Sequence, residues 1–206
     1  MSATALVRSK PKLTIRDLSL LTIAHGGHRD RSNGLCVMEI AAWFAGNEHS
    51  DSPSCVCPVI GTFLRSWNDS LPDDETRTRL LLPLVKKIVG TKADAKVEFA
   101  RAMLCVDWFI RECAPAWIET LPALKHHADT LRAAKPIEDY KDLDRVLAPL
   151  RSAEKDALAA WSAAGSAAGS AAGSAAGSAA ESSLKPTTER LQKSAVDLVA
   201  RLCAVK

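Results

Sequence analysis

The sequence lacks any long, uninterrupted apolar run. No window reaches the roughly 18 uncharged apolar residues that a membrane-spanning helix requires. Residues 1–12 contain no apolar core of signal-peptide length. We therefore expect a cytoplasmic protein that does not contact a membrane.

A strong charge of one sign is also missing. Lys and Arg number 27 against 24 Asp and Glu, the formal net charge is +3, and no basic cluster occurs. Proteins that bind nucleic acid neutralise phosphates with clustered Lys and Arg side chains. The composition therefore predicts no nucleic-acid partner.

Paired C-x-x-C motifs are absent, although the chain has six cysteines. Disulfides are rare in a reducing cytosol, so we expect free buried thiols or metal ligands.

No segment shows the apolar–polar alternation of a half-buried strand, whereas helical spacing recurs along the chain. We predict an all-α fold with a compact multi-helix domain. The helices are expected over residues 15–24, 35–45, 58–69, 73–89 (kinked at Pro83), 91–113, 116–121, 123–134 and 137–161 (interrupted at Pro149). A break or a turn is expected at Pro115.

Composition divides the chain into three parts: a helical domain (1–161), a low-complexity SAAG segment (162–186) and an amphipathic C-terminal helix (187–206). Alanine favours a helix in the repeat, but each of its four glycines costs about 1 kcal/mol against one. A flexible linker and a marginal helix both fit the repeat.

The C-terminal helix carries an apolar stripe that has to be covered. The stripe either packs back on the domain or binds a protein partner or a second copy. The residues of such an interface would be Leu191, Leu198, Val199 and Leu202.

The stretch HGGHRDRSNGLCVMEIAAWFAG (25–46) places one acid, Glu39, in an apolar helix. A buried carboxylate without a partner is expensive and tends to protonate. Glu39 therefore needs a histidine, an arginine or a metal, unless its strip of the helix faces water. Asp107 is a second lone acid in an apolar helix, and Arg111 lies four residues on as a local partner. Two such acids suggest a shared polar interior.

Histidines and cysteines lie close to Glu39 in the sequence. Zinc favours sets of imidazole and thiolate ligands. The ligands predicted for a zinc site are His25, His28, Cys36 and Cys55, with His49 and Cys57 nearby. Glu39 would then orient a ligand or act as a base.

A thiol enzyme is the other chemical interpretation. A helix start favours a thiolate, and both Cys36 and the pair Cys55 and Cys57, which precede Pro58, lie at such a start. His25 or His28 could serve as the base. The catalytic candidates are Glu39, Cys36 and Asp107. Buried structural cysteines are nevertheless common.

Several of these motifs together resemble a family of small uncharacterised bacterial and phage proteins. The resemblance covers about residues 15–121 and implies no particular activity. The motifs are His25-Gly-Gly-His28, Cys36-Val-Met-Glu39, Ser50-Asp51-Ser-Pro53-Ser-Cys55, Pro58-Val59-Ile60, Phe63-Leu-Arg65-Ser-Trp67-Asn68-Asp69, Asp107-Trp108 and Ala114-Pro115-Ala116-Trp117.

The sequence therefore predicts a helical structural or interaction module, stabilised in one version by a His/Cys metal site. The alternative is a small enzyme that uses the His/Cys/Glu cluster for metal-assisted or thiol chemistry.

Overall fold

The structure, a computed structural model, describes the backbone of residues 13–168 and 173–206 and the side chains of residues 13–160 and 182–206. The predicted absence of a signal peptide concerns residues 1–12 and lies outside the described residues. In the described part every regular element is a helix, which confirms the all-α prediction. None of these helices is both long and apolar enough to cross a membrane.

The chain divides into two compact units, Met1–Glu98 with Cys203–Lys206, and Phe99–Leu202. This boundary falls inside the predicted first domain of residues 1–161. The three-part division by composition stays a prediction.

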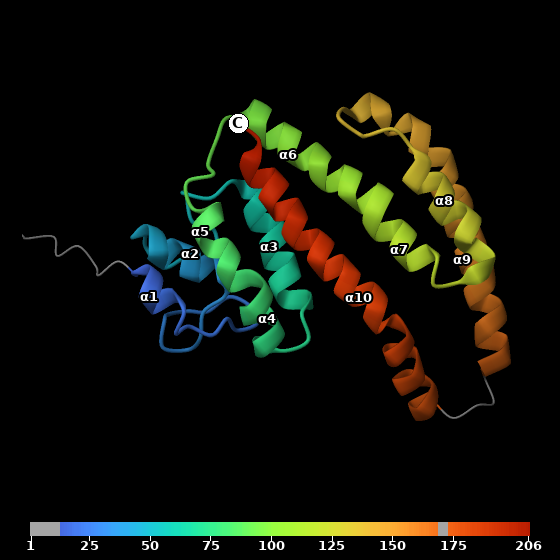
Figure 1. The fold of residues 1–206 in the computed structure, drawn as a ribbon, viewed down its shortest axis with the longest axis horizontal. Coiled ribbons are helices and arrows are strands. Elements are labelled where there is room, and N and C mark those ends of the chain that lie inside the picture. The colour runs from blue at the N-terminus through green and yellow to red at the C-terminus, as the bar shows by residue number, and fades with distance from the viewer. Residues whose placement is uncertain (1–12, 169–172) are drawn as a thin grey trace, which may run out of the picture. The chain divides into compact units, whose positions relative to one another are not determined.

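The first unit contains α1 to α5 and the start of α6. Its helices are α1 (Ile15–Leu18), α2 (Val37–Ala45), α3 (Pro58–Ser70), α4 (Asp74–Leu81) and α5 (Val85–Ile88). In this unit α2 packs against α3 and α5 (Figure 1). Their facing side chains are fully buried: Ile40, Ile60, Leu64, Val85 and Ile88 are 0 % exposed.

Two sequence signals act locally in this unit. Thr14 and Asp17 form the predicted capping box, but the helix that they start ends at Leu18. The prediction of a helix to residue 24 is wrong. The amide of Ile23 bonds to the hydroxyl of Thr78 instead, at 2.9 Å, and Ile23 is completely buried. Pro83 interrupts the fourth predicted helix, as expected, by a 3₁₀ turn (Leu82–Leu84) between α4 and α5.

The second unit contains most of α6 and the elements α7 to α10. Its helices are α6 (Ala95–Trp108), α7 (Ala114–Ile118), α8 (Lys125–Ala133), α9 (Asp144–Ala168) and α10 (Gly173–Ala204). A π-helix (Phe109–Cys113) leads into α7 at the predicted break near Pro115. Proline lacks an amide hydrogen, and this wider turn lies where a break or a turn was predicted. The interruption predicted at Pro149 is wrong, because α9 continues through that residue.

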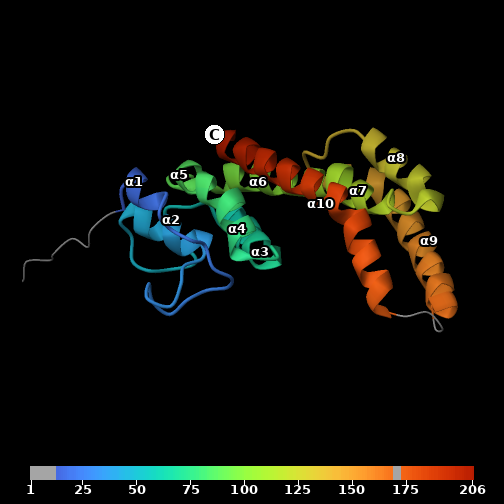
Figure 2. The same cartoon turned by 60° about the horizontal axis from the view of Figure 1, so that its bottom comes forward.

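Apolar packing in this unit centres on Ile110, Leu131, Ile137 and Val146. α7 packs on α8, and α8 lies along α9 (Figures 1 and 2). The SAAG segment is helical wherever it is described, in α9 up to Ala168 and in α10 from Gly173. Residues 169–172 of the repeat lie outside the described part.

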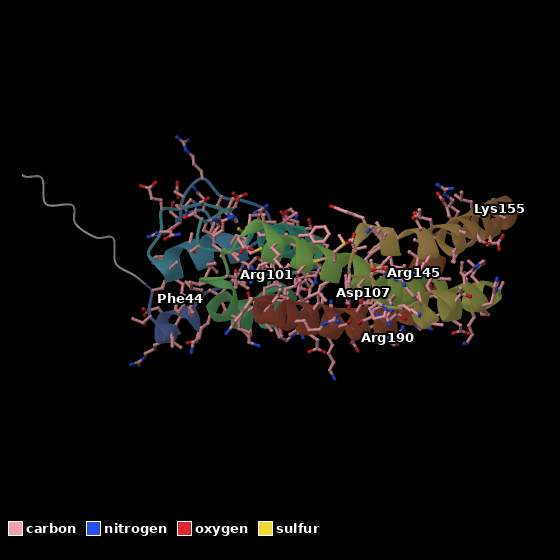
Figure 3. The ribbon with its side chains drawn as sticks, turned by 90° about the horizontal axis from the view of Figure 1, so that it is seen from above. Phe44, Arg101, Asp107, Arg145, Lys155 and Arg190 are labelled. Carbon is pink, nitrogen blue, oxygen red and sulfur yellow. The ribbon has the colours of Figure 1, made fainter. Side chains whose placement is uncertain are left out.

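The C-terminal half of α10 runs antiparallel to α6. Arg101, labelled in Figure 3, donates from Nε to the carbonyl of Leu202 at 2.9 Å, and Trp108 Nε1 donates to Ser194 Oγ at 2.7 Å. An arginine on one of the last carbonyls of a helix satisfies a group that the helix itself leaves open.

The predicted apolar stripe of α10 is covered within the chain itself. Leu198, Val199 and Leu202 are 0 % exposed, and Leu191 is half-buried. Their burial supports the first of the two predicted alternatives, in which the stripe packs back on the chain. Binding of a partner or a second copy through the four residues stays a prediction.

Candidate functional site

Glu39 lies in the first turn of α2, in the interior of the first unit. Its side chain is 1 % exposed. The alternative that its strip of the helix faces water is therefore wrong, and the carboxylate requires donors from the protein.

Groups from three residues surround the Glu39 carboxylate. Its Oε1 accepts the backbone N–H of His28 at 2.6 Å, and its Oε2 accepts the backbone N–H of Cys36 at 2.8 Å. Nδ1 of His28 lies 2.9 Å from Oε2, and Nε2 of His49 lies 3.4 Å from Oε1. We call Glu39, His28, His49 and the amide of Cys36 the Glu39 centre. Of the partners predicted for Glu39 (a histidine, an arginine or a metal), the structure supplies histidines.

His49 connects the loop after α2 to the loop before it. Its Nε2 lies 2.8 Å from the carbonyl oxygen of His28, to which it donates in the tautomer that carries hydrogen on Nε2. Its Nδ1 is buried and has no hydrogen-bond partner among the described residues. Asp51 approaches from the same loop, since a Cβ built on Gly27 would lie 3.6 Å from Asp51 Oδ2 and 4.0 Å from Glu39 Oε1.

The hydrogen bonds keep Glu39 ionised. Burial by itself raises the pKa of its carboxyl group, but the amides of His28 and Cys36 and the His28 side chain outweigh burial. The net result is a pKa below the usual 4.5. An ionised Glu39 is an acceptor only, so Nδ1 of His28 carries the hydrogen between them.

The pKa of the Cys36 thiol is shifted in the opposite direction, upward. Burial, with the nearby Glu39 charge as a smaller cause, raises its pKa from 9.0 to about 12. Burial also raises the pKa of the Cys55 thiol. Both groups are therefore protonated thiols near neutral pH, and a thiol is a far weaker nucleophile and metal ligand than a thiolate.

Gly34 closes the centre on the far side of the His28 ring. Its φ is +112°, and a Cβ built there would lie 2.6 Å from His28 Nε2 and 2.9 Å from His28 Cδ2. The Gly34 backbone therefore covers the edge of the ring that Glu39 does not hold. The sequence pattern around Gly34 did not indicate this role.

Asn68 of α3, which is fully buried, holds the same loop on the other side. Its side chain accepts the amide of Val37 at 3.3 Å and donates to the carbonyl of Ala24 at 3.1 Å. Asp69 accepts the amide of Gly26 at 2.9 Å. α2 and α3 thus position the loop from Ala24 to Cys36 through side chains at their ends.

The structure gathers the predicted zinc ligands only in part. His28 and Cys36 meet at Glu39, but His25 is exposed. Cys55 lies elsewhere, with its carbonyl on the amides of Gly90 and Lys92. Among the described residues, these four predicted ligands do not form a group with closely spaced ligand atoms.

Asp107, labelled in Figure 3, belongs to the second unit, whereas the Glu39 centre lies in the first. Its carboxylate pairs with Arg111 at 3.2 Å, as the i,i+4 spacing predicts, and its Oδ1 accepts the amide of Ile137 at 2.9 Å. Each acid therefore has partners within its own unit. The shared polar interior of Asp107 and Glu39 and a catalytic role for Asp107 stay predictions.

A second cluster of potential ligands lies between α8 and α9. His126, His127 and Asp156 offer one ligand atom each within 4.8 Å of one another. His127 is 7 % exposed, whereas His126 is exposed. The adjacent histidines are visible in the sequence, but Asp156 lies 29 residues away, and only the packing of α8 on α9 unites them.

Comparison with protein-family models, with curated proteins and with solved structures gives no match for this chain. The resemblance to small bacterial and phage proteins stays a prediction. Function therefore has to be argued from the geometry of these two clusters.

Proposed function

We propose that this chain is a helical structural module, and that the Glu39 centre holds the loop from Ala24 to Cys36 onto α2 and α3. The observation that carries the proposal is the saturation of the Glu39 carboxylate. It accepts two backbone N–H groups and one imidazole N–H, with a second imidazole 3.4 Å away. A carboxylate occupied in this way has little capacity left for a substrate or a metal ion.

Thiol chemistry receives little support from the same residues. A Cys36 thiol with a pKa of about 12 and 2 % exposure is neither ionised nor accessible near neutral pH. A zinc site at His25, His28, Cys36 and Cys55 lacks the convergence of ligands that tetrahedral coordination needs.

One observation favours an enzyme as the second candidate. Glu39 orients His28 through Nδ1, which is how a carboxylate positions a histidine base. A base of this kind has to reach its substrate through Nε2. The His28 side chain is only 12 % exposed and Gly34 lies beside its Nε2, which leaves a substrate little room there.

The substitution Glu39→Gln separates the two functions. It keeps the shape of the side chain but removes the charge, and it turns an amide NH₂ toward N–H donors. We expect the free energy of unfolding to fall by about 3 kcal/mol, because buried hydrogen bonds to a charged group contribute about 1.5–3 kcal/mol each. The matched control is Glu48→Gln at an exposed position of the same unit, expected within about 0.5 kcal/mol of the wild type.

Urea unfolding of both variants measures these values. Residues kept for catalysis commonly lower stability, so that their removal leaves it unchanged or higher. A Glu39→Gln protein as stable as the wild type would refute the structural role and support the enzyme.

A further inference from the structure

The His126–His127–Asp156 cluster of the second unit plays no part in the structural role proposed for Glu39. His126 and His127 open α8, and Asp156 projects from α9 three residues after the buried Ala153. Nε2 of His127 lies 2.8 Å from Asp156 Oδ2, and the two imidazole rings lie 3.9 Å apart between centroids. Two nitrogens and one oxygen thus converge at the edge of this helix pair.

We propose that His126, His127 and Asp156 bind a divalent transition metal ion, for which Zn²⁺ is the best match. Imidazole nitrogen and carboxylate oxygen are ordinary zinc ligands, and three protein ligands leave a fourth position to water or to a ligand. The bound ion would connect α8 to α9.

The distances fit a metal-free form of such a site. Two ligands of a tetrahedral zinc lie about 3.3 Å apart, given zinc–ligand bonds of about 2.0–2.1 Å. The 2.8 Å contact between His127 and Asp156 therefore has to open by about half an ångström. Asp156 can supply this movement because its side chain is 46 % exposed, whereas His127 is held in the α8 interface.

A simple His–Asp hydrogen bond explains His127 but not His126. His126 is exposed, yet its ring lies against the ring of His127. Two protonated imidazoles at this distance would repel each other, whereas a metal ion binds the neutral form of both. The neighbouring Lys125 is paired with Asp129 at 2.9 Å, so its positive charge is partly neutralised beside the site.

Zinc titration of the full-length chain without a histidine tag tests the proposal. The protein is first freed of metal with a chelator, and Zn²⁺ binding is then measured against a chromophoric competitor. Co²⁺ provides the second measurement, because its visible absorption reports the coordination geometry. We expect one equivalent of Zn²⁺ to bind with a Kd in the micromolar range or below.

The variants His126→Gln and Asp156→Asn change side chains that are exposed or half-exposed, so both should fold. Each removes one ligand and should weaken zinc binding at least about 100-fold, since even the loss of a residue that only orients a ligand costs about 10–100-fold. The matched control is His25→Gln, an exposed histidine of the first unit, which should bind zinc like the wild type.

Two results would overturn the proposal. One is less than about 0.1 equivalent of zinc bound at micromolar concentration. The other is equal affinity in wild type, His126→Gln and Asp156→Asn. Neither result depends on Glu39, whose role is tested separately by unfolding.

Discussion

The substitution Gly34→Ala gives the most direct test of how the Glu39 centre is built. Gly34 has φ +112°, and a methyl group there would lie 2.6 Å from Nε2 of His28. Contact at that distance forces the imidazole to move. The ring cannot move freely, because its Nδ1 is held 2.9 Å from Glu39 Oε2.

The expected cost has two parts. A φ of this kind is essentially restricted to glycine and costs an alanine about 1–3 kcal/mol. Displacing the ring also weakens a buried hydrogen bond to a charged group, worth about 1.5–3 kcal/mol. Together they lower the free energy of unfolding by about 3–5 kcal/mol.

Gly90→Ala is the matched control, because Gly90 also has a positive φ (+81°) but no atom within 4 Å of its built Cβ. It carries backbone strain alone, about 1–2 kcal/mol. Urea unfolding with linear extrapolation measures both variants. In a Glu39→Gln background the extra cost of Gly34→Ala should shrink, because the bond that resists the ring movement is already lost. Equal costs for the two glycine variants would show that the His28 ring is not held as described.

Three further predictions concern protonation and metal binding. Because the pKa of Glu39 is lowered in the folded state, its ionised form stabilises the fold fully above pH 4.5, and this contribution is lost as the pH falls through the folded-state pKa. The free energy of unfolding, measured from pH 6 to 3, should therefore decline less in Glu39→Gln than in the wild type. The native Cys36 thiol should react with iodoacetamide at pH 7.5 at least about 100-fold more slowly than in urea, and mass spectrometry showing equal rates would contradict its raised pKa and burial. Zinc at 100 times its Kd should stabilise the wild type by about 2.7 kcal/mol but not His126→Gln, as thermal unfolding would show.

A good part of the Glu39 centre could be predicted from the sequence. A single acid in an apolar helix requires a partner wherever the helix is buried, and histidines stood close on both sides. His28 and His49 meet that requirement at 2.9 Å and 3.4 Å. The same reasoning failed for His25 and Cys55, since spacing along loops does not determine which side chains converge. Proximity in sequence favoured four metal ligands, whereas the folded loop satisfied Glu39 by backbone amides that no side-chain pattern reveals.

Local interactions account for what could be predicted. Three predicted features depend only on residues a few positions apart, so the local sequence specifies them. They are the Thr14–Asp17 capping box, the interruption at Pro83 and the Asp107–Arg111 pair. The burial of Leu198 and Leu202 and the pairing of His127 with Asp156 depend on contacts between helices distant in the chain. An apolar side chain or an imidazole can contact many different partners, and the packing of whole helices determines which partner lies beside it in the fold.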